Sequence, residues 1–224
     1  MDAGVAPEVC ASSLRKLCAI LALLAGCGTY SNHLTARPTK PGAVDLGVHI
    51  DVVGTERGTM SRSILPNPEI MVRVGLADGF DFGGKINFLG AELSSRIGLV
   101  EGDFDLAFAP GIGLSLATRT SEETEAFVFT GKLPLLAGVH IGDIVTLVGG
   151  FTGIFHVTAG SGESDNSDVI LYPGGTFGVD LQLAKIISLF PEINVHVPYH
   201  VNLERWRKPV FQGGLAVRLT FGAE

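Results

Sequence analysis

The sequence predicts an all-β protein, a closed antiparallel up-and-down β-barrel of about ten strands. Large apolar residues alternate with small or polar ones from Ala43 almost to the C-terminus, and no helical period interrupts them. Charged residues make up 17% of the chain, against roughly 25% in soluble domains, and its 30 glycines are about twice the usual ~7%. Connections between the alternating segments are mostly long and short in turn, as in membrane-spanning barrels.

The alternation is clearest over residues 104–116. Even-numbered positions there are large and apolar or proline, whereas odd-numbered positions are acidic, tiny or hydroxylic. A strand of this kind has one apolar face and one face of small residues, which suits a crowded surrounding. We therefore expect the apolar face to contact lipid and the other face to line the inside of the barrel.

Ten segments carry the alternation, and they average about ten residues, the length that a tilted strand needs to cross a bilayer. They are 44–52, 70–76, 80–88, 92–99, 104–116, 127–141, 144–158, 169–183, 187–199 and 211–221. Pro110, Pro134, Pro173 and Pro191 fall within them and cannot donate to a ladder, so we expect bulges there. Because the number of strands is even, the start of the first strand and the end of the last strand should lie on the same side of the membrane.

The N-terminal region has the layout of an export signal. The basic pair Arg15-Lys16 precedes the apolar run 17–24, which is too short to span a bilayer. The run ends in Leu-Ala-Gly-Cys27, which resembles the lipobox of bacterial lipoproteins. The resemblance implies that residues 1–26 are a signal peptide and that Cys27 is the acylated first residue of the mature chain.

Residues 27–42 are then expected to be an acylated N-terminus and tether, since they are polar and show neither the period of a strand nor that of a helix. Residues 43–222 form the predicted barrel, and Phe221 near its end is similar to the C-terminal assembly signal of outer-membrane barrels. These resemblances imply a Gram-negative outer-membrane protein with a periplasmic N-terminus. Membrane lipids and the outer-membrane assembly machinery are its expected partners.

Charged residues on the inner face are predicted to form ion pairs that plug the lumen. The acids are Asp45, Asp51, Asp81, Glu92, Asp105, Asp180 and Glu192, and the bases are Arg73, Lys85, Arg96, Lys132 and Arg218. Asp45 in the first strand and Arg218 in the last should be neighbours if the barrel closes. The expected function is a structural, porin-like or transport-accessory role.

Enzymatic chemistry is not expected, and the sequence indicates no catalytic, metal or cofactor site. His156, His196 and His200 would lie towards one rim, where an outer-membrane hydrolase could place a catalytic histidine, but no serine or aspartate is spaced to complete a dyad. The net charge of −7 and the lack of clustered Lys and Arg argue against nucleic-acid binding.

Two surface features have plain interpretations. Loop carboxylates could attract divalent cations but are expected to be solvated; they are Glu122, Glu123, Glu125, Glu163, Asp165 and Asp168. Trp206, flanked by basic residues, could rest at the level of the lipid headgroups.

Two alternatives stay open at this point. A soluble periplasmic lipoprotein barrel would turn the Phe-rich face inward and bind an apolar ligand. A hydrolase at the barrel rim is the weaker alternative.

Overall fold

The computed structural model describes residues 30–55, 63–88, 90–119, 124–160 and 168–222. Thirteen strands occur in these ranges, and no helix among the described residues is long and apolar enough to cross a bilayer. The strands are β1 (Val44–Thr55), β2 (Ser63–Ala77), β3 (Phe80–Asn87), β4 (Gly90–Val100), β5 (Phe104–Phe108), β6 (Gly111–Arg119), β7 (Thr124–Ile141), β8 (Val145–Gly160), β9 (Asp168–Ala184), β10 (Ile187–His196), β11 (Tyr199–His200), β12 (Arg205–Trp206) and β13 (Val210–Phe221). Cys27 and the leader lie outside the described residues.

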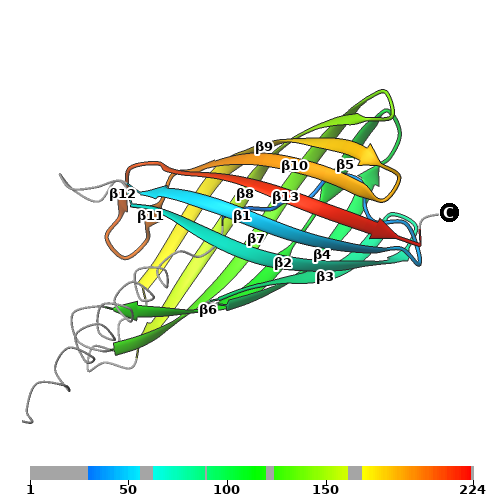
Figure 1. The fold of residues 1–224 in the computed structure, drawn as a ribbon. Helices are drawn as coiled ribbons and strands as arrows, with labels where there is room; N and C mark the ends of the chain where they lie inside the picture. Colours follow the sequence, from blue (N-terminus) through cyan, green and yellow to red (C-terminus); the bar gives the residue numbers. More distant parts are fainter. Residues whose placement is uncertain (1–29, 56–62, 89, 120–123, 161–167, 223–224) are drawn as a thin grey trace, which may run out of the picture.

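The sheet closes on itself through the first and last strands (Figure 1). β1 pairs with β2 on one side and with β13 on the other, and all pairings between strands of the ring are antiparallel. β5 and β6 share one register against β7, so they are one strand interrupted at Ala109 and Pro110. β11 and β12 form a short hairpin beside β9. The result is a closed antiparallel barrel of ten strands, as predicted.

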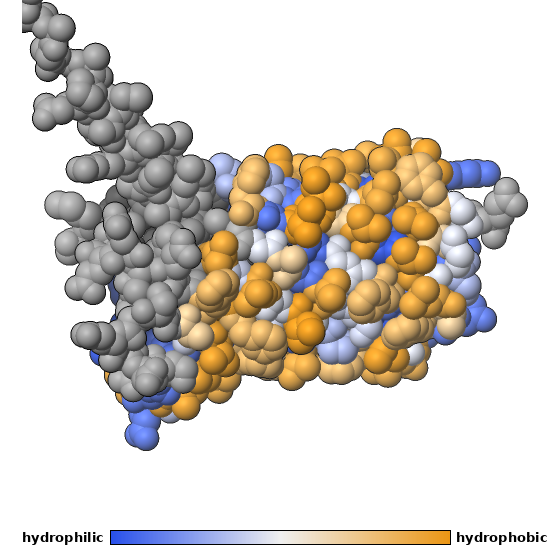
Figure 2. All heavy atoms as spheres, turned by 90° about the horizontal axis from the view of Figure 1, so that it is seen from below, coloured by the Kyte–Doolittle hydropathy of each residue, from blue (hydrophilic) through white to orange (hydrophobic). Residues whose placement is uncertain are grey.

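Side chains divide cleanly between the two faces of this ring. Apolar residues such as Val48, Ile70 and Leu135 are exposed on the outside, and Figure 2 shows apolar side chains spread over the barrel wall. Charged residues such as Arg73 and Arg96 are buried in the lumen. The alternative of a barrel with an apolar interior is therefore wrong for this chain.

The two ends of the barrel differ in their connections. At one end, which we call the short-turn end, the chain reverses within residues 78–79, 101–103, 142–144 and 185–186. At the other, the long-loop end, it connects strands through residues 56–62, 120–123, 161–167 and 197–209, with one brief connection at 88–89. β1 begins and β13 ends at the short-turn end (Figure 1).

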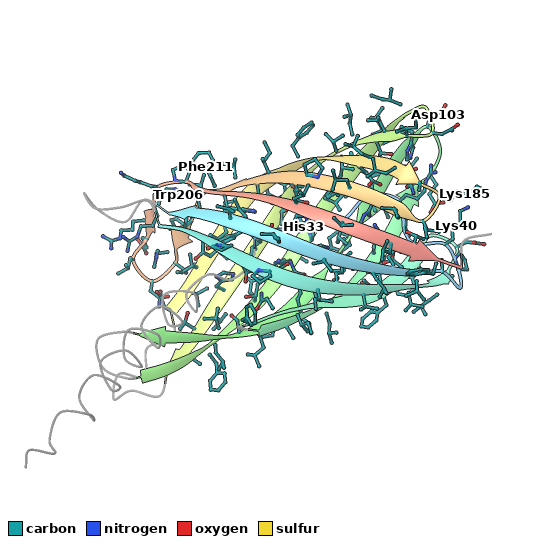
Figure 3. The ribbon with its side chains drawn as sticks, viewed as in Figure 1. His33, Lys40, Asp103, Lys185, Trp206 and Phe211 are labelled. Atoms are coloured by element: carbon teal, nitrogen blue, oxygen red, sulfur yellow. The ribbon has the colours of Figure 1, made fainter. Side chains whose placement is uncertain are left out.

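Residues 30–39, which we call the luminal segment, lie inside the barrel. All of them except Arg37 are buried, and the chain then turns at the short-turn end to enter β1. Figure 3 shows His33 enclosed by the strands, whereas Lys40 lies at the short-turn end. The expectation of a polar tether over 27–42 is thus wrong for residues 30–39, because their polar groups find partners among the charged lumen residues.

The prolines are accommodated without the predicted bulges. Pro110 coincides with the break between β5 and β6, and Pro134 on β7 lies opposite that break, where its carbonyl accepts a bond from Ala109. The register does not shift at Pro173 or Pro191. Shifts occur instead next to the short turns, for example at Gly75/Ala77.

The outward apolar face generates a stability prediction. Val48→Arg places a charge midway along β1 against hydrocarbon, which should lower the free energy of unfolding in lipid vesicles by about 2–4 kcal/mol. Leu203→Arg, in the exposed connection at the long-loop end, should cost no more than about 1 kcal/mol. Urea titration of both variants in vesicles measures the difference, and equal losses would contradict a lipid-facing β1.

Candidate functional site: the closed lumen

The first residue of the luminal segment, Tyr30, is held by residues of β8, β9, β10 and β13. The Tyr30 amide donates to Gln212 Oε1 at 2.9 Å. Its ring packs against Tyr172 at 5.1 Å between centroids and against His196 at 5.4 Å. These contacts form an aromatic cluster inside the lumen, near the long-loop end.

His33 lies between two carboxylates that flank one glycine. Asp51 on β1 and Glu192 on β10 both face Gly214 of the intervening strand β13. The His33 amide donates to Glu192 Oε2 at 2.8 Å, and its Nε2 lies 2.7 Å from Asp51 Oδ1. A Cβ at Gly214 would lie 1.8 Å from Asp51 Oδ1 and 2.8 Å from the His33 ring, so only glycine leaves room for this arrangement. His33 itself has φ 45°, an uncommon conformation for a residue with a side chain.

The carbonyl of Ser31 binds two lysines. Lys85 Nζ donates to it at 2.8 Å and Lys132 Nζ at 3.2 Å. The lysines are in turn paired with acids, Lys85 with Glu69 at 3.3 Å and Lys132 with Glu92 at 2.7 Å. The luminal segment therefore completes a charged network that spans β2, β3, β4 and β7.

Nearer the short-turn end, Asp81 binds two arginines at once. Arg73 Nη2 lies 2.5 Å from Asp81 Oδ1, and Arg96 Nε donates to Asp81 Oδ2 at 2.9 Å. The Thr39 amide of the luminal segment adds a third donor to the same carboxylate at 2.7 Å. Arg96 also donates to the Thr35 carbonyl at 2.9 Å.

The structure places the predicted lumen residues as follows. Arg73, Asp81 and Arg96 come together, and Lys85 joins the separate network around Ser31. The pair expected between Asp45 and Arg218 is not formed. Their strands are neighbours, but Asp45 faces Thr220 and Arg218 faces Gly47, two residues further along β13 and β1. Arg218 instead pairs with Asp180 at 2.5 Å, and Asp45 accepts a bond from Thr39 Oγ1 at 2.7 Å.

Acids outnumber bases on the described part of the lumen wall. The acids are Asp45, Asp51, Glu69, Asp81, Glu92, Asp105, Asp180 and Glu192, and the bases are Arg73, Lys85, Arg96, Lys132 and Arg218. The luminal segment contributes no acid, and it donates to five of these eight carboxylates. It therefore compensates the acidic excess with amide, hydroxyl, histidine and arginine donors.

A small apolar cluster lines the middle of the segment. Leu34 and Ala36 pack with Met71, Ala109 and Leu136. The backbone also approaches the wall closely at Gly75, where a Cβ would lie only 1.9 Å from the Lys40 carbonyl oxygen. The segment is thus fitted to the wall by packing as well as by hydrogen bonds.

A cavity of about 1270 Å³ lies beside the segment at the short-turn end. Thr35 and residues 37–40 form one side of it, and residues of β1, β5, β7, β8, β9, β13 and the short turns form the rest. Arg37 crosses part of this space to Asp105, at 3.0 Å, and Asp105 also binds His140 at 2.5 Å.

The histidines considered as catalytic candidates occupy two environments. His156 and His196 are buried in the aromatic cluster around Tyr30. His200 lies at the long-loop end, 3.5 Å from Asp168. In the described part of the chain, no group of three or more His, Cys, Asp or Glu side chains is placed to hold a metal ion.

Ser31, Asp51 and His33 meet in the lumen, but in an order that does not suit nucleophilic catalysis. Asp51 accepts from Ser31 Oγ at 2.8 Å and contacts His33 through its other oxygen. A catalytic triad needs the histidine between the serine and the acid, so that it can take the hydroxyl proton. Here the carboxylate is in the middle, and the arrangement serves to hold the segment.

Trp206 lies on β12 at the long-loop end (Figure 3), and its ring packs against that of Tyr199 at a tilt, with 4.8 Å between the ring centroids. Of the loop carboxylates, Asp168 is described and pairs with His200, whereas Glu122, Glu123, Glu163 and Asp165 lie outside the described residues.

Sequence reasoning missed Glu69 and the whole luminal segment. Glu69 lies one residue before the predicted segment 70–76 and in phase with the inward-facing Met71 and Arg73, so extending the alternation by one residue would have found it. The segment has no period that would indicate its place. Its polar composition, next to a predicted lumen with more acids than bases, is the available signal.

No protein-family model matches the sequence, and no curated protein matches it. Three solved structures are similar in fold. They are the translocator domain of the autotransporter NalP from Neisseria meningitidis (15% identity, TM-score 0.44, covering 94% of this chain and 95% of that one), the attachment invasion locus protein Ail of Yersinia pestis (11%, 0.43, 81% and 99%), and the outer membrane protease OmpT from Escherichia coli (6%, 0.39, 85% and 100%). Similarities of this degree assign no activity to the chain.

The Asp81 cluster leads to a mutational prediction. Asp81→Ala leaves Arg73 and Arg96 without their buried partner and should lower the free energy of unfolding by about 3–5 kcal/mol. Asp143→Ala, in an exposed short turn, is the control and should stay within about 0.5 kcal/mol of the unmutated protein. Urea titration in vesicles compares them, and a similar small loss in both would show that the pair contributes little.

The close approach at Gly75 gives a second one. Gly75→Ala should push the luminal segment away from β2. A reporter cysteine in place of the buried Ala36 should then react with a soluble maleimide at least about tenfold faster. That factor corresponds to a free energy of displacing the segment that is lower by ~1.4 kcal/mol. Gly149→Ala, whose Cβ would meet nothing nearer than 3.9 Å, is the matched control. An unchanged rate in Gly75→Ala would count against close packing of the segment.

Proposed function

We propose that this chain is an outer-membrane β-barrel lipoprotein, acylated at Cys27, whose lumen is closed by its own N-terminal segment. Its role is structural, porin-like or transport-accessory, without enzymatic chemistry. The observation that carries the proposal is the combination of an apolar outer wall with a charged lumen occupied by residues 30–39.

The closed ladder supports a membrane location. In lipid every backbone N–H and C=O must be satisfied internally, and a closed antiparallel ring achieves this without an exposed edge. Bacterial barrels of this kind have short turns at the periplasmic side and longer external loops. On that basis the short-turn end faces the periplasm, and membrane lipids and the barrel assembly machinery are the partners we propose.

Closure of the lumen supports a scaffold or accessory role rather than steady conduction. Salt bridges and hydrogen bonds hold the segment along its length, from Gln212 near one end to Asp81 and Asp45 near the other. Substituting His156 or His200 should leave lipid and peptide turnover by outer-membrane preparations unchanged, and a loss of turnover would favour a hydrolase.

The experiment that tests the proposal removes the segment. The full chain in a planar bilayer should show no sustained current, whereas the variant lacking residues 30–39 should give discrete current steps. In a salt gradient, the reversal potential of these steps should indicate a preference for cations. Cation preference is expected because acids exceed bases on the described wall. Asp51→Asn with Glu192→Gln in the deletion background should reduce the preference.

Heat-modifiable migration on gels shows whether each variant has formed a barrel. If the deletion variant does not fold, Gly75→Ala provides a second way to loosen the segment. Folded variants that stay closed would refute the segment as the closing element, and steady current through the full chain would do the same.

A further inference from the structure

We infer that the chain preceding Tyr30 leaves the barrel at the long-loop end, so that the N-terminus and the C-terminus lie on opposite sides of the membrane. The polypeptide then crosses the membrane once through the lumen before it forms β1. The inference rests on where the described segment begins and on the direction in which it runs.

Tyr30 lies much closer to the long-loop end than to the short-turn end. Its neighbour His156 is four residues from the end of β8 at Gly160 and eleven from the beginning at Val145. Tyr172 is likewise four residues from the long-loop end of β9. With a rise of ~3.3 Å per residue and a tilt near 40°, these separations are about 10 Å to one face and about 28 Å to the other.

The route back to the short-turn end is already taken by the segment itself. Ser31, His33, Thr35 and Thr39 bind wall residues along that path, and Leu34 and Ala36 pack in the apolar cluster. The cavity at the short-turn end has Thr35 and residues 37–40 as one of its sides. A second pass of chain would have to displace these buried contacts, whereas an exit towards the long loops displaces none of them.

This direction determines where the proposed lipid anchor lies. Cys27 precedes Tyr30 by three residues, and three extended residues reach about 10 Å. That length suffices to reach the long-loop face and falls well short of the ~28 Å to the other face. This part rests on the proposed acylation of Cys27. On this inference the anchor belongs to the long-loop side, in place of the periplasmic N-terminus that the sequence resemblances imply.

An epitope insertion tests the side of exit. A short peptide epitope is inserted between Gly28 and Thr29 of the full chain, which leaves the lipobox and its following residue intact. Two control insertions carry the same epitope, one after Gly142 in the short β7–β8 turn and one after Leu203 at the long-loop end. Antibody binding is measured on intact cells and again after the outer membrane is permeabilised.

The expected result is that the Gly28 and Leu203 insertions bind antibody on intact cells, whereas the Gly142 insertion binds only after permeabilisation. An N-terminal epitope that behaves like the Gly142 insertion would overturn the inference, whichever way the barrel faces. If the insertion prevents heat-modifiable migration, Thr29→Cys labelled with a membrane-impermeant maleimide measures the same side, with the unsubstituted chain as background.

Acylation is measured separately by incorporation of an alkyne fatty acid into the full chain and into Cys27→Ser. Loss of label in Cys27→Ser with surface binding retained supports both proposals. Absence of label in the full chain with surface binding retained refutes the lipid anchor and leaves the side of exit standing.

Discussion

Enclosing eight carboxylates and five basic groups in a narrow lumen, all of them buried or partly buried, is the constraint on which the rest of the structure depends. Lipid outside leaves no room for these charges on the outer wall, and a buried charge without a partner costs several kcal/mol. The wall supplies too few bases to satisfy its acids. Asp51 and Glu192 receive donors from Ser31, Asn32 and His33 rather than from an arginine or lysine of the wall.

Glycine placement makes this compensation sterically possible. Along parts of β2, β7 and β13 the luminal segment lies so close to the wall that a side chain at the facing position would clash with it. Gly214 admits the His33 ring between two carboxylates, and Gly75 admits the backbone at Lys40. Gly138 performs the same role opposite Ala36, with a Cβ-to-Cβ separation of 3.2 Å if it were substituted. The high glycine content therefore reflects the lumen as much as the lipid-facing strands.

Much of the fold could be predicted from sequence because the information is local. Alternation of apolar and polar residues assigns Val48 to lipid and Arg73 to the lumen without knowledge of any partner. Partners could not be assigned in this way. Asp45 and Arg218 lie on adjacent strands, but a register offset of two residues gives each of them a different neighbour. The luminal segment escaped prediction because its contacts are remote, such as Tyr30 with Gln212, 182 residues away.

These remote contacts also constrain the order of assembly. The segment precedes β1 in the chain, yet Gln212 on β13 and Glu192 on β10 belong to the last strands to be made. β13 is also the strand that closes the ring against β1. A segment bonded to both sides of this seam cannot be fully fixed before the seam strands come together. Conversely, threading ten residues through a completed ring would require breaking the Asp81 and Lys85 networks that line the path. Wrapping of the barrel around the segment satisfies both conditions, because the late strands then bring their carboxylates to donors already held beside β1.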